Sequence, residues 1–407
     1  MDLSRFIAMR FAGRQPGRFS TPVLWIAKAT VALSVAVMLV SISVVIGFKS
    51  AITSKMENFS AHLQLVAFSK ESTDETLPID RNAEWVRGVE GVEGVIHIQP
   101  FVTKPAIIKS EKELEGVLLK GIDFNRQTDF FKQSLIQGTW PDGSSNPKGV
   151  FVSSILAKRL QLKLGQSFPM YYLKSGRKTP LRKELMLQGI FNTGLNEMDQ
   201  ALVLLPLQTV QELYGWDSSQ VSGHEVFFSD LDMLEVGLES MVTRWLPADI
   251  YPSTIFERYP DVFQWLPTLD QNARIILFLM ITVSLLAMIS TLLILILERT
   301  QSIGVLKALG MPHGMLLKIF WIRALSIVVQ GMIWGNLVAG ILIFIQSKTH
   351  LIPLNPEQYY LDHVPVSLPF MAFIGLNVGV FSLSMLSMLL PAAYASRIPV
   401  IKALKFA

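Results

Sequence analysis

The stretch Ile275–Leu297, IILFLMITVSLLAMISTLLILIL, holds 23 residues without a charged side chain. A helix of that length rises roughly 35 Å, which is enough to cross a hydrocarbon layer about 30 Å thick. Buried core helices are usually much shorter, so the stretch predicts a membrane-spanning helix. Three other stretches predict three further spans: Pro22–Phe48, which holds the single charge Lys28, and Ala324–Ser347 and Val364–Ser396, which hold none.

The composition of the whole chain agrees with a membrane protein. Of its 407 residues, 50% are apolar and 17% are charged, whereas soluble domains average about 25% charged residues. The mean hydropathy is +0.40, which is too apolar for a disordered chain. The sequence contains no cysteine, which excludes disulfides, thiolate metal sites and a cysteine nucleophile.

The distribution of Lys and Arg predicts the orientation of the spans. Residues 1–21, 298–323 and 397–407 together carry 11 basic and 2 acidic residues, while residues 49–274 carry 23 basic and 28 acidic residues. Because cytosolic loops are enriched in Lys and Arg, both termini and the 298–323 segment are expected in the cytosol. The 49–274 segment is expected on the outer side. It shows no basic stripe with interleaved aromatics, so no nucleic-acid partner is expected.

The expected organisation follows from these spans. In chain order it is a cytosolic segment at 1–21, transmembrane helix 1 at 22–48, an outer domain at 49–274, transmembrane helix 2 at 275–297, a cytosolic segment at 298–323, transmembrane helix 3 at 324–347, a short outer loop at 348–363, transmembrane helix 4 at 364–396 and a cytosolic tail at 397–407.

Within the 49–274 segment, strand-like and helix-like runs alternate, which predicts an α+β fold with β-α-β halves. Residues 131–205 are rich in Gly, Pro, Ser and short β-like runs, and predict an inserted β-rich lobe. The expected strands are His62–Phe68, Val95–Pro100, Gly116–Ile122, Ser167–Leu173, Leu185–Phe191, Val221–Phe228 and Ile250–Ile255, and the expected helices are Ile79–Arg87, Pro206–Tyr214 and Leu231–Trp245.

Motifs for catalysis, metal binding or nucleotide binding are absent from the sequence. His224 and Glu225 are adjacent, but no second His follows in the spacing of a zinc protease. The run Ser175–Thr179 has Arg after its Gly and lacks the earlier Gly of a phosphate loop. The chain is therefore not expected to be an enzyme, and the energy for any work must come from another subunit.

The informative segment follows the second predicted span: Glu298–Gly310, ERTQSIGVLKALG. Its residues Ile303, Leu306 and Leu309 recur at helical spacing, and Gly310 is expected to end the helix. The pattern predicts a short cytosolic helix with an apolar ridge. Two interpretations remain open on this evidence, a docking helix for a partner and a helix that lies on the membrane surface.

The same segment, extended to ERTQSIGVLKALGM, resembles the coupling segment of the FtsX-like, MacB-type permeases of ABC transporters. Gly121–Asp123 and Gly189–Gly194 most resemble permeases of the lipoprotein-releasing (Lol) system. Other matching stretches are Phe6–Phe11, similar to the amino-terminal amphipathic helix of the family, Ile46–Phe48, Gly149–Gly165 and Pro391–Leu404. One residue departs from the pattern, because Ser302 stands where many relatives have an acidic residue.

The resemblance implies a permease of the bacterial inner membrane that contains four spans and a porter-like periplasmic domain. Two cytosolic ATPase subunits would bind ATP and Mg²⁺, with no cofactor in this chain, and a second permease protomer, identical or related, would complete the complex. A lipoprotein would be lifted from the membrane and transferred to a periplasmic carrier. The residues implied in ATPase docking are Glu298, Arg299, Thr300, Ser302, Ile303, Val305, Leu306, Lys307, Leu309 and Gly310.

Extraction of acyl chains from a bilayer costs about 0.8 kcal/mol per CH₂, so an apolar cavity is expected to receive them. The candidates for its lining, at the outer ends of the first two spans, are Val45, Phe48, Met56, Leu277 and Phe278. Ordinary core or lipid contact is the competing interpretation of each. Two glycine pairs predict close packing of helices: Gly331 with Gly335, and Gly375 with Gly379.

Two other functions remain open within the same superfamily. A MacB-like exporter of drugs, peptides or signals would work with a periplasmic adaptor, although that type usually has its ATPase in the same chain. An FtsX-like signal relay would activate a cell-wall hydrolase, although its outer domain is usually about half the size of residues 49–274.

Overall fold

The computed structural model describes residues 20–68, 77–110, 113–125, 129–141, 149–174, 177, 179–298, 300–389 and 391. The chain divides into two compact units. The helical unit comprises residues 1–50, 265–353 and 363–407, and the sheet unit comprises residues 51–264 and 354–362. The stretch Phe6–Phe11, the residue Arg299 and the tail 397–407 lie outside the described residues.

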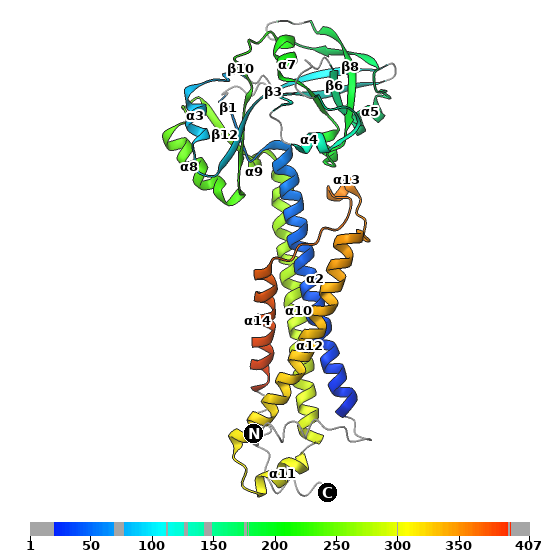
Figure 1. The fold of residues 1–407 in the computed structure, drawn as a ribbon, viewed down its shortest axis with the longest axis vertical. Helices are drawn as coiled ribbons and strands as arrows, with labels where there is room; N and C mark the ends of the chain where they lie inside the picture. The colour runs from blue at the N-terminus through cyan, green and yellow to red at the C-terminus, as the bar shows by residue number, and fades with distance from the viewer. Residues whose placement is uncertain are drawn as a thin grey trace. The chain divides into compact units, whose positions relative to one another are not determined.

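Four helices of the described chain are long and apolar enough to cross a membrane (Figure 1). They are α2 (Ser20–Ser60), α10 (Pro260–Glu298), α12 (His313–Thr349) and α14 (Phe370–Ser387), and the short α11 (Thr300–Ala308) lies between α10 and α12 in the sequence. Their buried side chains form one apolar cluster, which includes Val31, Val35, Met288, Leu292, Phe320, Ile327 and Val380. The burial of this cluster holds the described helices of the helical unit together.

The helices differ in length from the apolar stretches of the sequence. Both α2 and α10 continue beyond the apolar runs, and Lys49 and Asp270 form an ion pair there, with 2.7 Å between Nζ and Oδ2. The helix α14 begins later than the expected span at 364–396, because residues 364–369 are not helical. Pro365 and Pro369 explain the later start, since proline lacks a backbone N–H and disfavours a helical residue before it. Residues 390 and 392–396 of the expected span lie outside the described residues.

One half of the sheet unit is a four-stranded sheet with the order β12-β1-β11-β3. Its strands are β1 (Leu63–Ala67), β3 (Val95–Lys109), β11 (Gly223–Phe228) and β12 (Ile250–Thr254). All neighbouring pairs are antiparallel, so β1 is parallel to β3 and β11 is parallel to β12. The helix α3 (Glu84–Glu90) connects the first pair and α8 (Leu234–Arg244) connects the second, which gives two interleaved β-α-β units of the ferredoxin-like kind.

The other half of the sheet unit is a closed ring of strands. The order β3-β4-β9-β6-β8-β7 returns to β3, because β7 pairs with both β8 and β3. The additional strands are β4 (Leu114–Ile122), β5 (Leu135–Gly138), β6 (Gly149–Ser153), β7 (Ser167–Tyr172), β8 (Leu181–Phe191) and β9 (Leu202–Pro206). The lobe expected at 131–205 is therefore continuous with the first sheet through β3, which runs through both halves.

Most expected elements of the sheet unit are present with shifted ends, and the helix near Ile79–Arg87 requires a correction. Ile79–Asp80 is the strand β2, which pairs with β10 (Gln220–Val221), and the helix begins only at Glu84. The carboxylate of Asp80 accepts a hydrogen bond from the Asn82 N–H at 2.9 Å, which forms a turn that competes with a helix. The expected helix at Leu231–Trp245 is likewise split into the 3₁₀ turn η1 (Leu231–Met233) and α8.

Short helices complete the sheet unit: α4 (Asp129–Gln133), α5 (Ser154–Arg159), α6 (Asn196–Asp199), α7 (Leu207–Tyr214), α9 (Ile255–Arg258) and α13 (Pro356–Tyr359). The helix α7 packs closely on β4 at Gly121, where a Cβ would lie 2.9 Å from the Val210 side chain. That contact explains why a glycine stands within an otherwise bulky strand.

Candidate functional site

The segment between α10 and α12 has a buried side and an exposed side. In α11, Ile303 is buried in the apolar cluster of the helical unit, with 1% of its surface exposed. Val305 is 46% exposed and Leu309, just after the helix, is 79% exposed. The expectation that Ile303, Leu306 and Leu309 share one free ridge is therefore wrong, and the free apolar side chains are those of Val305 and Leu309.

The ends of α11 follow from its sequence. The Thr300 hydroxyl lies 3.0 and 2.9 Å from the carbonyl oxygens of Ile296 and Leu297, so its one proton is shared between acceptors at the end of α10. Gly310 has φ of +87°, and the N–H of Met311 bonds to the carbonyl of Leu306 at 3.1 Å. This glycine-dependent stop ends the helix as the sequence predicts.

The remaining residues expected at the ATPase interface are spread over the segment. Ser302, Leu306 and Lys307 are half-buried, and Gly310 is exposed. The side chain of Glu298 has one buried oxygen, Oε2, without a hydrogen-bond partner among the described residues. The structure thus separates the nine described residues of this set into a side that packs on the bundle and a smaller exposed side.

The two glycine pairs have different surroundings. A Cβ at Gly331 would lie 2.7 Å from the Val31 side chain, and one at Gly335 would lie 2.6 Å from the carbonyl oxygen of Ala32. These glycines allow α12 to lie directly against α2. At Gly375 and Gly379 a Cβ would meet no described atom within 4 Å, so this face of α14 is open in the described chain.

The residues expected to line a cavity differ in their burial and belong to both units. Phe48 is buried and contacts the ring of Trp265 edge-on, with ring centroids 5.9 Å apart. Leu277 packs partly buried against the apolar cluster, whereas Phe278 is 69% exposed. Val45 is half-buried, and Met56 is fully buried in the sheet unit.

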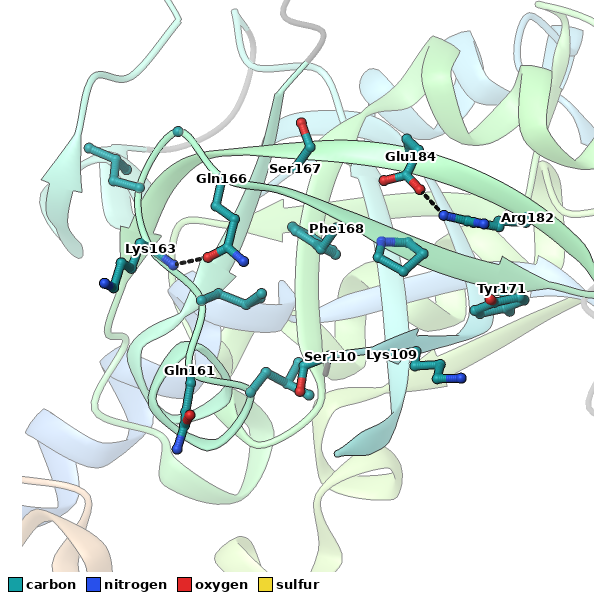
Figure 2. Close-up of a pocket in the computed structure, with 15 residues that line it drawn as sticks. Lys109, Ser110, Gln161, Lys163, Gln166, Ser167, Phe168, Tyr171, Arg182 and Glu184 are labelled. Atoms are coloured by element: carbon teal, nitrogen blue, oxygen red, sulfur yellow. Dashed lines mark hydrogen bonds and ion pairs between the residues drawn. The ribbon is translucent and has the colours of Figure 1, made fainter. Parts of the chain in front are cut away.

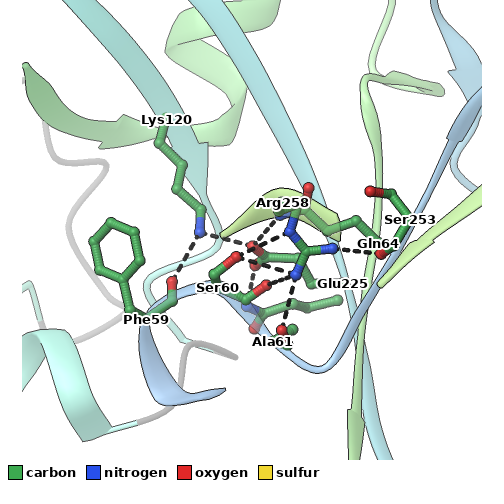
Figure 3. A network of polar contacts seen from close by, with 9 residues as sticks. Phe59, Ser60, Ala61, Gln64, Lys120, Glu225, Ser253 and Arg258 are labelled. Atoms are coloured by element: carbon green, nitrogen blue, oxygen red, sulfur yellow. Dashed lines mark hydrogen bonds and ion pairs between the residues drawn. The ribbon is translucent and has the colours of Figure 1, made fainter. Parts of the chain in front are cut away.

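The last residues of α2 are held in the sheet unit by a polar network, which we call the joint and define as Ser60, Ala61, Gln64, Lys120, Glu225 and Arg258. Figure 3 shows the Arg258 guanidinium directed at the backbone that leaves α2. Arg258 donates to the carbonyl oxygens of Ser60 and Ala61, at 2.8 and 2.9 Å. These carbonyls are orphan acceptors at a helix end, where a cation is also favoured by the helix dipole.

Glu225 is the acceptor at the centre of the joint. Its side chain is 1% exposed on β11 and forms an ion pair with Lys120 of β4, with 2.7 Å between Oε1 and Nζ. Gln64 also donates to Oε1, at 3.1 Å, and Gln99 donates to Oε2, at 2.9 Å. Lys120 donates a further hydrogen bond to the carbonyl of Phe59, at 3.3 Å. A buried carboxylate is tolerated here because every one of these donors compensates its lost hydration.

The joint connects two helices that are distant in sequence. Arg258 is the last residue of α9, only two positions before α10 begins at Pro260. Thr254 caps α9 with a capping box, in which Thr254 and Glu257 bond reciprocally, and this fixes the direction in which the chain leaves β12. The end of α2 and the approach to α10 are therefore held by the same buried side chains.

A groove of about 960 Å³ lies on the ring of strands, and none of the joint residues lines it (Figure 2). Its lining includes Phe168 and the charged side chains of Lys109, Lys163, Arg182 and Glu184. Arg182 and Glu184 form an ion pair at the surface. Charged side chains of this kind would have to be desolvated beside an acyl chain, so the groove suits a polar surface and not the apolar cavity that lipid chains require.

The sequence alone does not identify Lys120, Glu225 and Arg258 as functional residues. It places Glu225 only in an incomplete metal motif, and Lys120 in an ordinary strand. A signal was nevertheless present, because each charge interrupts a strand that is otherwise buried, GHEVFF and GVLLKGI. Opposite charges in two buried strands indicate a buried pair, but the partner can be identified only from the fold.

Family models match both parts of the chain. Residues 25–241 match the MacB-like periplasmic core domain, and residues 274–400 match the FtsX-like permease C-terminal domain. Since the first match covers more than half of the chain, the protein belongs to the permeases that carry a MacB-like periplasmic core domain. The resemblance of the coupling segment and of the outer domain to this family is confirmed.

Relatives of known name match the chain nearly from end to end. The lipoprotein-releasing system transmembrane protein LolC of Neisseria meningitidis is 22% identical over 423 residues, which cover 100% of this chain and 99% of that protein. LolE of Haemophilus influenzae is 22% identical over 98% of each chain. The macrolide export ATP-binding/permease protein MacB of Bartonella quintana is 27% identical over 56% of this chain and 33% of its own length.

Solved structures of outer domains are also similar to part of the chain. The extracellular domain of the noncanonic ABC-type transporter YknZ from Gram-positive bacteria is 16% identical, with a TM-score of 0.34, and covers 47% of this chain and 99% of that domain. The periplasmic region of MacB from Actinobacillus actinomycetemcomitans is 12% identical, with a TM-score of 0.33, over 49% of this chain and 91% of that structure.

Proposed function

We propose that the chain is the permease subunit of an ABC transporter that extracts lipoproteins from the bacterial inner membrane and delivers them to a periplasmic carrier. The end-to-end similarity to LolC and LolE supports this cargo. The observation that carries the mechanical part of the proposal is the joint, in which the end of α2 and the approach to α10 share one buried network. Motion of either helix then acts on the β-sheet and not on a flexible loop.

The proposed sequence of events begins at a separate ATPase, which binds ATP and Mg²⁺. Two such subunits, paired with two permease protomers, would close on ATP and displace α11 through the exposed side chains of Val305 and Leu309. The displacement would pass along α10 to Arg258, and from there to the sheet. Both chain termini and α11 would lie in the cytosol, because the basic residues concentrate there.

Work of this kind is needed because acyl chains leave a bilayer at a cost of about 0.8 kcal/mol per CH₂. Two or three long chains therefore require tens of kcal/mol unless an apolar surface receives them. The apolar candidates at the outer ends of the spans remain Val45, Phe48, Met56, Leu277 and Phe278, and they would have to come together during the cycle to form one cavity.

The decisive experiment replaces the two exposed apolar side chains of this segment, Val305 in α11 and Leu309 just after it. The variants Val305→Asp and Leu309→Asp are expected to abolish copurification of the ATPase and ATP-dependent release of a labelled lipoprotein from proteoliposomes. Leu164→Asp is the matched control, because Leu164 is 47% exposed in the sheet unit and should leave both measurements unchanged. If the ATPase still associates fully with both the Val305→Asp and the Leu309→Asp variants, α11 does not have the proposed docking role.

A second candidate function is export with a periplasmic adaptor, which the partial match to the macrolide exporter MacB favours. The two functions differ in what the complex binds. Acylated proteins that copurify with the complex from native membranes would support lipoprotein release, and an adaptor protein would support export. A copurifying cell-wall hydrolase would instead support the signal relay.

A further inference from the structure

Three segments of the sheet unit meet at the side chain of Lys55, which lies on α2 close to the joint. The ammonium donates a hydrogen bond to the carbonyl oxygen of Tyr360 at 2.8 Å. It also lies in a notch at Gly194, where a Cβ would be 2.3 Å from Nζ. Helix α2, the loop 192–199 after β8 and the segment 354–362 are therefore joined at one charged group.

The loop 192–199, which includes the short helix α6, is held next to Lys55 by internal hydrogen bonds. The buried carboxylate of Asp199 accepts hydrogen bonds from the N–H and the hydroxyl of Thr193, at 2.9 and 2.8 Å. Asn192 accepts from the N–H of Gly194 at 2.8 Å. Gly194 has φ of +71°, a conformation in which a side chain would be strained. A side chain at position 194 would therefore strain the backbone and would also occupy the space that the Lys55 ammonium fills.

The segment 354–362 makes other contacts besides the one with Lys55. Tyr360 has φ of +58°, and burial together with the nearby carboxylate of Glu197 raises the pKa of its phenol. The N–H of Leu354 bonds to the carbonyl of Asp362 at 2.9 Å, which closes the segment on itself. The carboxylates of Asp199 and Asp362 both attract the ammonium, so the charge of Lys55 is compensated from the loop and from the segment.

We propose that Lys55 is a positioning residue that seats the segment 354–362 against α2 and the loop 192–199 in the resting protein, and that this contact opens when α2 moves during the ATP cycle. We call Lys55, Gly194 and Tyr360 the latch. The inference rests on the proposed force relay. Opening the latch exchanges one hydrogen bond to a carbonyl for one to water. Opening the joint would expose a buried ion pair, which costs more. A moving α2 therefore breaks the latch first.

The test uses hydrogen exchange of the complete complex, read in peptides that cover 354–362 and the joint. Lys55→Met removes the charged donor and is expected to raise exchange in 354–362 about tenfold or more, with no change at the joint. Gly194→Ala, which closes the notch, should have the same effect on 354–362. Lys49→Met is the matched control on the same helix, because Lys49 pairs only with Asp270 among the described residues, and should leave 354–362 unchanged.

The opening of the latch is measured in the unmodified complex. Trapping with ATP and vanadate should raise exchange in 354–362 relative to the nucleotide-free complex. Unchanged exchange in Lys55→Met, or no response of 354–362 to trapping, would overturn the inference. A complex that shows both exchange effects but releases no lipoprotein would contradict the proposed cargo and leave the latch supported, so the two failures are distinguishable.

Discussion

The joint and the latch hold the outer part of α2 in two different ways. At the joint, Arg258 and Lys120 supply several hydrogen bonds to the end of the helix, and the Glu225 carboxylate is compensated by three donors. At the latch, α2 contributes one hydrogen bond, from the Lys55 ammonium to the Tyr360 carbonyl, and two carboxylates attract the ammonium. The difference indicates that a contact meant to persist under load is buried and multiply bonded, while a contact meant to be released has only one hydrogen bond from the moving helix.

The largest effect is expected where a single partner of the buried pair is removed. Lys120→Met leaves the Glu225 carboxylate buried without its ion pair and should destabilise the protein by about 3–5 kcal/mol. The double variant Lys120→Met/Glu225→Gln should be markedly less harmful than the sum of the single variants, because no charge is stranded. Thermal unfolding of the purified complex measures both, and additive losses would show that the pair is not coupled.

The next largest effect is a pH dependence in the stability of the loop 192–199, which contacts Lys55. Burial raises the pKa of Asp199 to about 6 from its ordinary 3.8, although the hydrogen bonds from Thr193 and the charge of Lys55 oppose the shift. The folded loop thus binds the proton more tightly than the unfolded loop, so its stability is greatest below about pH 4, falls between pH 4 and 6, and is constant above. The total change corresponds to about 3 kcal/mol.

Asp199→Asn should remove this slope, as measured by hydrogen exchange of 192–199 after correction for intrinsic rates. Burial lowers the pKa of His224 to about 4, so this histidine titrates in the same range with the opposite sign. The informative quantity is therefore the difference between the wild-type protein and the variant. If that difference does not depend on pH, Asp199 does not titrate in the folded protein.

Substitution of Arg258 is expected to have a smaller effect on stability and a larger effect on the coupling of ATP hydrolysis to lipoprotein release. Arg258→Gln keeps a polar side chain but removes the charged donor to Ser60 and Ala61, at an expected cost of about 1–3 kcal/mol. The complex should then hydrolyse ATP while lipoprotein release falls, because α10 no longer acts on the end of α2. Arg244→Gln, on the exposed face of α8, is the control. Parallel losses of hydrolysis and release would argue against uncoupling.

The smallest effect is expected for the ion pair between Lys49 and Asp270, whose side chains are 38% and 44% exposed. Exposed pairs contribute at most about 1 kcal/mol and are screened by salt. Lys49→Met should therefore shift thermal unfolding slightly, and less at high ionic strength. A shift as large as that of Lys120→Met would show that this pair is shielded from solvent in the assembled complex.

Local patterns predicted much of the molecule. The four apolar helices follow from runs such as Ile275–Leu297, since length and lack of charge are sufficient to identify a span. The sequence also predicted the end of α11 at Gly310 and a strand at Val221–Phe228, where β11 lies, because both depend on neighbouring residues. The glycine pairs show the limit of such reasoning, because a Cβ at Gly331 would collide with α2 whereas a Cβ at Gly375 would meet no described atom within 4 Å, although the spacing within the two pairs is identical.

The amino-acid sequence alone determined that this chain has four apolar helices, a mixed α+β domain and a segment that resembles those of a known permease family, because these properties depend on composition and on residues close together in the chain. Only the tertiary structure decided that β7 closes the ring onto β3, that Ile303 faces inward, and that Lys55, Gly194 and Tyr360 meet. Such contacts join residues separated by tens to hundreds of positions, and whether they form depends on how all intervening elements pack.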